Sequence, residues 1–260
     1  MSVLPGLERT FDSVAQAYDR WRPCYGDAAY QAIFAYCPVS AQSNVVEIGI
    51  GSGQATRPFL QKGCRVTAVE PGEQFAALCR AKFQEYPAFL IRTGKLEETD
   101  FPDGTVDLVF SATAFHWIAQ EIGYPKVFSM LKSGGAFVRM DNHPFEDKGR
   151  TKLADEIQAL YQIYMGSTAR PVEYGDAMAK AKAEIAARYG FTDIRYQLLK
   201  RTRQFSAREY TALLGTYSDH IAIEETKRIE FFEKIEQAID RHGGRYTVYD
   251  TIELQLARKP

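Results

Sequence analysis

Short apolar runs of strand length alternate with segments whose apolar residues recur at helical spacing in the first half of the chain. Runs of the first kind stand at 44–50, 66–70, 88–92, 106–111 and 136–140. Helices are expected at 27–34, 54–61 and 71–83, and another is expected to end at the glycine pair Gly134–Gly135, which would act as its C-cap. Strands that alternate with helices predict an α/β domain with a parallel sheet.

The second half of the chain predicts more helix, followed by a final strand. Residues 151–188 are rich in Ala, Lys and Glu and contain two predicted helices. A strand is expected within 190–205, and Ser206 and Glu209 fit a capping box that begins a helix ending at Leu214. A long helix is predicted over 223–242, and 245–258 alternates as a strand.

The composition and charge of the chain are those of a globular protein and favour neither nucleic-acid nor membrane binding. The 260 residues are 45% hydrophobic and 25% charged, which is ordinary for a globular protein. A formal net charge of −1 gives no general attraction for nucleic acid or an anionic membrane. No apolar run approaches the roughly 20 residues of a membrane span, and the first residues lack the apolar region of a signal peptide. We therefore expect a cytoplasmic protein without nucleic-acid or membrane partners.

The four cysteines predict unpaired thiols. Cys24, Cys37, Cys64 and Cys79 form no C-x-x-C pair and lie mostly in apolar contexts. Neither a disulfide nor a metal site is expected from them.

A glycine-rich turn after the first strand carries the clearest chemistry. Residues 47–53 read E-I-G-I-G-S-G, and glycines there let the backbone approach a ligand and adopt positive φ. The following helix would point free N–H groups at that ligand. Glu70 ends the next strand, where an acid accepts hydrogen bonds from ribose hydroxyls. Neither Gln54 nor Thr56 completes the G-x-G-x-x-G of nicotinamide-binding proteins.

Five stretches together resemble class I S-adenosylmethionine (SAM)-dependent methyltransferases. The E-x-G-x-G-x-G of 47–53 is similar to their motif I, F-P-D-G-x-x-D-L-V at 101–109 to their fourth strand, and L-K-S-G-G at 131–135 to their L-K-P-G-G. F-D-x-x-A-x-x-Y-D followed by R-P-x-Y, at 11–25, resembles the N-terminal lid of small-molecule methyltransferases. Residues 110–117, F-S-A-T-A-F-H-W, resemble the trans-aconitate-type and related small-acid enzymes.

This resemblance implies a Rossmann-like sheet of seven strands, mostly parallel with the last strand antiparallel and with helices on both faces. It implies one domain over 1–260, with lid helices at 8–37 and a helical cap insertion at 144–188 over the substrate pocket. The cofactor would be SAM and the product S-adenosylhomocysteine (SAH). The expected cofactor-binding residues are Tyr18, Arg22, Tyr25, Glu47, Gly49, Gly51, Gly53, Glu70, Pro71, Leu96, Glu97 and Ser111.

Roles within this set follow from charge. Arg22 would pair with the cofactor's carboxylate, and aromatic faces would attract its sulfonium. Lys95 stands where the family often has an aspartate, so either Glu97 or another group reads the adenine.

The acceptor would lie beyond the fourth strand. The expected substrate-binding residues are His116, Trp117, Asn142 and Tyr217. His116 is a candidate base for an oxygen or nitrogen nucleophile, and a structural histidine is the alternative. A small molecule, such as a carboxylic acid, is the favoured acceptor. Lys200, Arg201 and Arg203 suit an acid, although charges on an edge strand are the more common explanation for such a cluster.

Two other functions stay open. A macromolecular methyltransferase is one, although Ser111–Ala114 reads S-A-T-A rather than the N-P-P-Y-like tetrapeptide of nucleic-acid amino-group enzymes. A non-catalytic SAM-binding or interaction protein is the other. No motif determines the oligomeric state.

Overall fold

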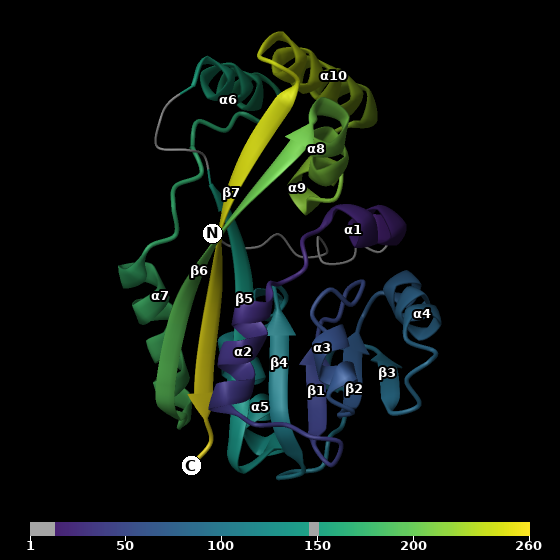
Figure 1. Cartoon of the computed structure of the whole chain (residues 1–260), viewed down its shortest axis with the longest axis vertical. Helices are drawn as coiled ribbons and strands as arrows, with labels where there is room; N and C mark the ends of the chain where they lie inside the picture. The colour runs from purple at the N-terminus through teal and green to yellow at the C-terminus, as the bar shows by residue number, and fades with distance from the viewer. Residues whose placement is uncertain (1–13, 146–150) are drawn as a thin grey trace.

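One seven-stranded sheet organises the protein (Figure 1). The computed structural model describes residues 14–145 and 151–260, so the first residues of the predicted lid and part of the predicted insertion lie outside the described residues. The strands are β1 Asn44–Ile48, β2 Arg65–Glu70, β3 Phe89–Thr93, β4 Val106–Ala112, β5 Leu131–Phe145, β6 Thr192–Ser206 and β7 Arg245–Arg258. Their order is β3-β2-β1-β4-β5-β7-β6. The first five strands pair in parallel and β7 is antiparallel to both its neighbours, which confirms the predicted sheet.

Helices cover both faces of the sheet, as predicted. The α-helices are α1 Ala15–Trp21, α2 Asp27–Tyr36, α3 Arg57–Gln61, α4 Glu73–Lys82, α5 Gln120–Met130, α6 Lys152–Met165, α7 Asp176–Ala183, α8 Ala207–Leu214, α9 Ser218–Ile221 and α10 Glu225–Arg241. Short 3-10 helices are η2 Leu96–Glu98, η3 Phe115–Trp117 and η4 Glu184–Tyr189. Helices α2 and α3 pack on one face around Phe59 and Phe110, whose rings stack at 4.2 Å. Helices α5 and η4 pack on the other around Tyr124 and Phe137.

Two element boundaries differ from the predictions. The helix after the glycine turn begins at Arg57 and not at Gln54, because Pro58 at the helix start is tolerated only in the first turn. The predicted glycine C-cap is also wrong. Helix α5 ends at Met130, and Gly134 and Gly135 lie in the first part of β5, where the pairing with β4 shifts register.

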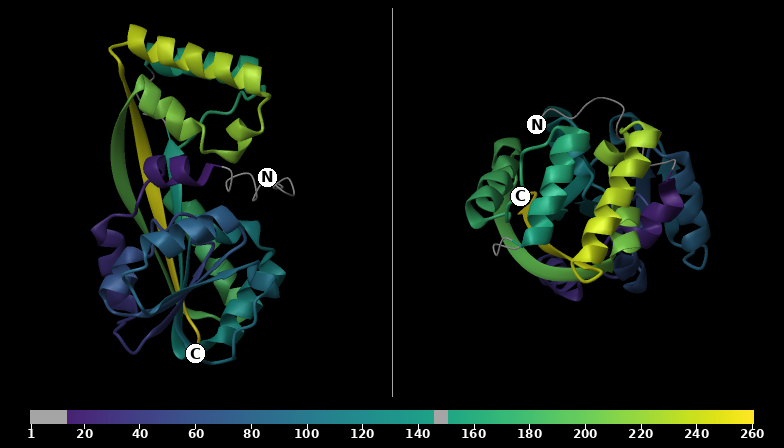
Figure 2. Two further views of the ribbon diagram at one scale, coloured as in Figure 1. Left: turned by 90° about the vertical axis from the view of Figure 1, so that its right-hand side faces the viewer. Right: turned by 90° about the horizontal axis from the view of Figure 1, so that it is seen from above.

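Three long strands extend beyond the parallel part of the sheet, and a second layer of helices packs around their ends. Strands β5, β6 and β7 have 14 or 15 residues each, whereas β1 to β4 have 5 to 7. β5 was expected to end near Met140 but continues to Phe145, because β7 pairs with it from Ala136 to Phe145. Helices α6, α8, α9 and α10 gather around the upper part of these strands, above α1 (Figures 1 and 2). They share a core that includes Ile157, Leu213 and Phe231.

The predicted helices of the second half are present, including the Ser206–Glu209 capping box at the start of α8. Helix α6 packs against α10, and α7 packs against β6. The upper layer is therefore assembled from α6 together with α8, α9 and α10, so the 144–188 stretch supplies only one of its helices.

The basic residues of β6 are paired within the chain. Asp250 of β7 is fully buried and accepts hydrogen bonds from Arg203 at 2.6 and 3.0 Å and from Arg201 at 3.2 Å. Asn142 donates to the same carboxylate at 3.0 Å. Lys200 contacts Glu173 at 2.6 Å. Because β6 is the edge strand, these contacts favour the interpretation of edge-strand charges over that of an anion site.

Three further observations concern the described ranges 14–145 and 151–260. The four cysteines are unpaired, which confirms the predicted thiols. Within those ranges no helix is long and apolar enough to cross a membrane. The same residues contain no group of three or more His, Cys, Asp or Glu side chains arranged to hold a metal ion.

Candidate functional site

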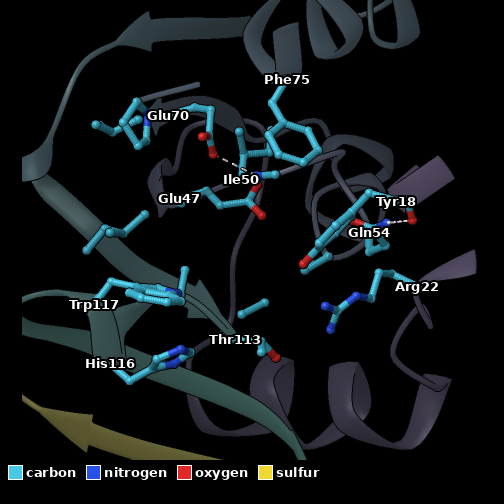
Figure 3. Close-up of a pocket in the computed structure, with 18 of the residues that line it drawn as sticks. Tyr18, Arg22, Glu47, Ile50, Gln54, Glu70, Phe75, Thr113, His116 and Trp117 are labelled. Atoms are coloured by element: carbon cyan, nitrogen blue, oxygen red, sulfur yellow. Dashed lines mark hydrogen bonds between the residues drawn. The ribbon is translucent and has the colours of Figure 1, made fainter. Parts of the chain in front are cut away.

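A cavity of about 620 Å³ opens beyond the carboxyl ends of β1, β2 and β4 (Figure 3). This is the position at which open α/β sheets bind ligands. The glycine turn and Glu70 form one wall, and α1 with the start of α9 forms another. His116 and Trp117 lie opposite Tyr18 and Arg22. The cavity therefore lies between the parallel sheet and the upper helical layer.

The three glycines of the turn serve different purposes. All have positive φ, at 68°, 54° and 78° for Gly49, Gly51 and Gly53. A Cβ on Gly49 would lie 2.4 Å from the Cβ of Ala114, so this glycine allows two loops to touch. A Cβ on Gly51 would meet only the Tyr18 ring, at 3.8 Å, on the cavity side. Gly53 instead packs on Phe83, and the structure does not bring it to the cavity as we had expected.

Glu70 is held facing the cavity by backbone donors. One of its carboxylate oxygens accepts the N–H of Gly51 and the other the N–H of Gly72, both at 2.9 Å. Its position at the end of β2, facing the cavity, suits the hydroxyls of a ribose.

Glu47 has a different environment one strand away. Its side chain is buried and accepts a hydrogen bond from the Thr56 hydroxyl at 2.7 Å. Burial raises the pKa of Glu47 to about 8, and the Glu70 charge adds to the effect. The carboxyl is therefore mainly neutral at pH 7. Glu47 also lines the cavity.

Glu47 makes the stability of the fold depend on pH. An acid whose pKa is about 8 when folded and about 4.5 when unfolded binds an extra proton in the folded state between those pH values. The free energy of unfolding should therefore fall by up to about 1.4 kcal/mol per pH unit as the pH rises through that window. Urea unfolding at pH 5.5 and 7.5 should show this fall in the wild type and lose it in Glu47→Gln.

Glu98→Gln is the matched control, because Glu98 is exposed on η2. Its pH dependence should follow the wild type. An equal pH dependence in Glu47→Gln and the wild type would contradict the neutral, buried state of Glu47.

Helix α1 and the residues after it bring aromatic and basic groups to the cavity. Arg22 donates from Nε to the Thr216 hydroxyl at 2.9 Å and from its terminal nitrogen to the Thr216 carbonyl at 2.7 Å. Its guanidinium lies 3.9 Å from the centre of the Tyr217 ring and 4.8 Å from that of Tyr18. Arg22 thus joins the end of α1 to Thr216 and Tyr217 beside the cavity.

Tyr25 reaches the loop after β4. Its hydroxyl lies 2.6 Å from the hydroxyl of Thr113, a non-glycine residue with φ of 54°. That conformation is costly for a β-branched residue, and such strain clusters at functional sites. Burial raises the pKa of the Tyr25 hydroxyl, which stays protonated and can donate.

Some of the other predicted cofactor-binding residues line the cavity and one does not. Leu96 and Glu97 on η2 line the cavity, as do Lys95 and Pro71. Ser111 does not line it, contrary to our expectation. The Ser111 hydroxyl is buried and donates to the Ile48 carbonyl at 2.9 Å, so it joins β4 to β1.

The four expected acceptor residues all line the cavity: His116, Trp117, Asn142 and Tyr217. The amide of Asn142 is fixed, because its oxygen accepts from Arg201 at 2.7 Å while its nitrogen donates to Asp250. Burial, with smaller contributions from neighbouring cations, lowers the pKa of His116. Of the described residues in 144–188, only Pro144 lines the cavity.

Sequence reasoning missed several lining residues. They include Ile50, Gln54, Phe75, Thr113 and Ser218. Gln54 donates to the Tyr18 carbonyl at 3.4 Å, and Phe75 packs edge-on to the Tyr18 ring at 5.2 Å. The sequence predicted the glycine turn next to Gln54 and the helix that contains Phe75. It did not predict that α1 would pack against both residues.

A family model described as a methyltransferase domain matches residues 46–139. This match spans the glycine turn, Glu70 and the loop that carries His116. Over these residues the chain is similar to methyltransferase domains.

Relatives with similar sequences extend the match. An uncharacterized methyltransferase of Mycobacterium tuberculosis is 30% identical over 151 residues, which cover 58% of this chain and 59% of that protein. The chain thus aligns with less than two thirds of the length of this relative. An uncharacterized methyltransferase of Schizosaccharomyces pombe is 24% identical over 86% of this chain and 85% of its own length.

Solved structures share the fold. A candidate type II methyltransferase from Anaeromyxobacter dehalogenans matches with a TM-score of 0.62 and 20% identity, over 91% of this chain and 97% of its own. A Haemonchus contortus phosphoethanolamine N-methyltransferase, solved with phosphomonomethylethanolamine and SAH, matches with a TM-score of 0.56 and 14% identity. That match covers 96% of this chain and 57% of the other.

Proposed function

We propose that this protein binds SAM in the cavity and transfers its methyl group to a small-molecule acceptor by in-line attack. The observation that supports this most directly is the Glu70 carboxylate, held toward the cavity beside a glycine whose missing side chain leaves the cavity open. The match of residues 46–139 to a methyltransferase domain supports the same cofactor.

The residues present suit each part of this cofactor. Glu70 would accept the ribose hydroxyls, and the backbone at Gly49 and Gly51 would border the methionyl part. Arg22 would pair with its carboxylate, and the rings of Tyr18 and Tyr25 would attract the sulfonium. Leu96 and Glu97 would border the adenine.

Methyl transfer needs little from the side chains. Bound SAM supplies a methyl group on a positively charged sulfur, which leaves as a neutral thioether. The protein's main contribution is alignment, and holding two reactants in line can contribute roughly 7 to 11 kcal/mol. His116 is needed as a base only for an oxygen or nitrogen nucleophile that loses a proton.

The acceptor would occupy the part of the cavity between His116, Trp117, Asn142 and Tyr217. The Haemonchus contortus enzyme of the same fold binds a small phosphorylated amine together with SAH. A carboxylic acid is one candidate here, supported by the F-S-A-T-A-F-H-W stretch. The paired state of Lys200, Arg201 and Arg203 argues against their serving as its binding site.

Calorimetric titration with SAH, with NAD as a parallel control, tests the cofactor. We expect binding of SAH and none of NAD, and binding of NAD alone would contradict the proposal. Incubation with methyl-labelled SAM and a small-molecule library then tests transfer. Labelled product supports the enzyme, whereas SAH binding without product across broad libraries favours a non-catalytic SAM-binding protein.

Replacement of Glu70 by glutamine should weaken SAH binding by about 1.5 to 3 kcal/mol, because hydrogen bonds to a charged acceptor are lost. The glutamine amide keeps one oxygen acceptor but brings an N–H₂ group toward the donors at Gly51 and Gly72. Glu73→Gln, on the exposed first turn of α4, is the control and should bind normally.

An SAH analogue without ribose hydroxyls makes this test specific. The wild type should prefer SAH to the analogue, and Glu70→Gln should lose most of that preference. An unchanged preference in Glu70→Gln would assign the ribose to another residue.

A further inference from the structure

A buried network of charges connects the acceptor side of the cavity to helix α7. Asp141 of β5 and Glu253 of β7 are direct partners in the antiparallel register, and both are buried. Like charges that face each other across two strands repel. Lys182 of α7 lies between them, 2.8 Å from Asp141 and 2.9 Å from Glu253, and offsets that repulsion.

The two oxygens of Asp141 have different surroundings. Its Oδ2 accepts from Lys182 and lies 3.5 Å from a terminal nitrogen of Arg139. Arg139 is in turn held by the Tyr124 hydroxyl at 2.7 Å. The Oδ1 of Asp141 faces the imidazole of His116, and 3.9 Å separates this oxygen from Nδ1 of the ring. One oxygen is therefore anchored by two cations while the other is directed at the candidate base.

His116 occupies the boundary between this network and the cavity. Its side chain is 40% exposed, against 10% for Asp141, and it lines the cavity beside Trp117. The 3.9 Å separation exceeds a direct hydrogen bond. Hydrogen bonds of this kind are often long in unliganded active sites and tighten when substrate binds.

We propose that Asp141 is the positioning residue for His116. It holds the imidazole with Nδ1–H toward its own Oδ1, so that Nε2 is the atom that accepts a proton from an oxygen or nitrogen nucleophile in the cavity. This inference rests on the proposed function. The proton lost by the nucleophile moves to Nε2, and the positive charge that leaves the cofactor with the methyl group ends on the imidazole beside the Asp141 carboxylate.

The network gives helix α7 a role in the site, although α7 does not line the cavity. Lys182 fixes Asp141, and Asp141 would orient His116. Glu253 is held by His143 at 2.9 Å and by Tyr174 at 3.0 Å. Glu253 thus keeps Lys182 in place from the far side.

The charges around His116 have opposing effects on its pKa. Burial lowers it, as do Lys182, Arg139 and His143, whereas Asp141 raises it. The imidazole is therefore mainly neutral at pH 7 and able to accept a proton. Removal of Asp141's charge should lower the pKa further, and removal of Lys182's charge should raise it.

Nitrogen NMR of histidine-labelled protein tests the proposal without a known acceptor. His116 is assigned by the resonances that disappear in His116→Gln. We expect the neutral imidazole of the wild type to carry its proton on Nδ1. In Asp141→Asn this preference should weaken and the pKa should fall by about one unit. In Lys182→Met the pKa should rise. Asp240→Asn, on an exposed position of α10, is the control.

A proton on Nε2 in the wild type, or a His116 pKa that Asp141→Asn leaves unchanged, would overturn the proposal. If Asp141→Asn does not fold, the wild-type tautomer and the Lys182→Met shift still decide it. SAH titration of the wild type separates this result from the proposed function. Absence of SAH binding contradicts the cofactor assignment, whereas an Nε2–H tautomer contradicts only the role of Asp141.

Discussion

Replacement of Gly51 by valine is expected to weaken SAH binding about 1,000-fold or more, which corresponds to about 4 kcal/mol. Two effects combine. A Cβ at this position enters the cavity next to Tyr18, and the two methyl groups of valine extend into space that the ligand needs. A φ of 54° is also unfavourable for a residue with a Cβ, by about 1–2 kcal/mol. Calorimetric titration with SAH measures the change.

Gly104→Val separates these two effects. Gly104 has φ of 63°, and a Cβ there would meet no atom within 4 Å. This variant therefore has the same backbone strain, in a turn remote from the cavity, and should bind SAH normally. If Gly51→Val binds SAH as tightly as Gly104→Val does, the glycine turn does not border the ligand.

Replacement of Asp250 by alanine should lower the free energy of unfolding by about 3–5 kcal/mol. Asp250 is the only carboxylate that the described contacts place against both Arg201 and Arg203, and its removal leaves two guanidinium groups uncompensated. Arg203 is 14% exposed, so water replaces the lost partner poorly. Urea unfolding, followed by circular dichroism, measures the effect.

Asp240→Ala is the control for this change, because Asp240 is exposed on α10 and its loss should alter stability by less than about 0.5 kcal/mol. A similarly small effect of Asp250→Ala would show that the arginines remain solvated in the folded state. Arg203→Met together with Asp250→Ala should recover part of the loss, since removing both partners leaves fewer unpaired charges.

The parallel part of the fold could be predicted because its signals are local. Each of the first four strands is a short, mainly apolar run, and the bounds of β7 follow directly from the sequence pattern. Alternation also predicted β7, and a capping box predicted the start of α8. Local patterns are reliable where burial and backbone geometry impose the same choice of residue.

The rest of the site depends on contacts between distant segments. Nothing near Thr113 indicates positive φ, which a threonine rarely adopts. The hydrogen bonds from Arg22 to Thr216 connect residues 194 positions apart. Ser111 and Gly53 stand in the same sequence motifs as residues that do line the cavity. Ser111 is nevertheless hydrogen-bonded to β1, and Gly53 packs on Phe83. Tertiary position decides such cases.

The place of β7 within the sheet has a consequence for the order of folding. The last strand in the sequence fills the gap between β5 and β6, and its register with β5 pairs residues more than 100 positions apart. Strands β1 to β5 make their contacts within the first 145 residues and can associate while a ribosome is still adding later ones. Contacts of such high contact order form slowly. Completion of the cavity by Tyr217 and Ser218 should therefore be a late event, and the half-built sheet presents an open edge at β5 that a chaperone or a second nascent chain could occupy.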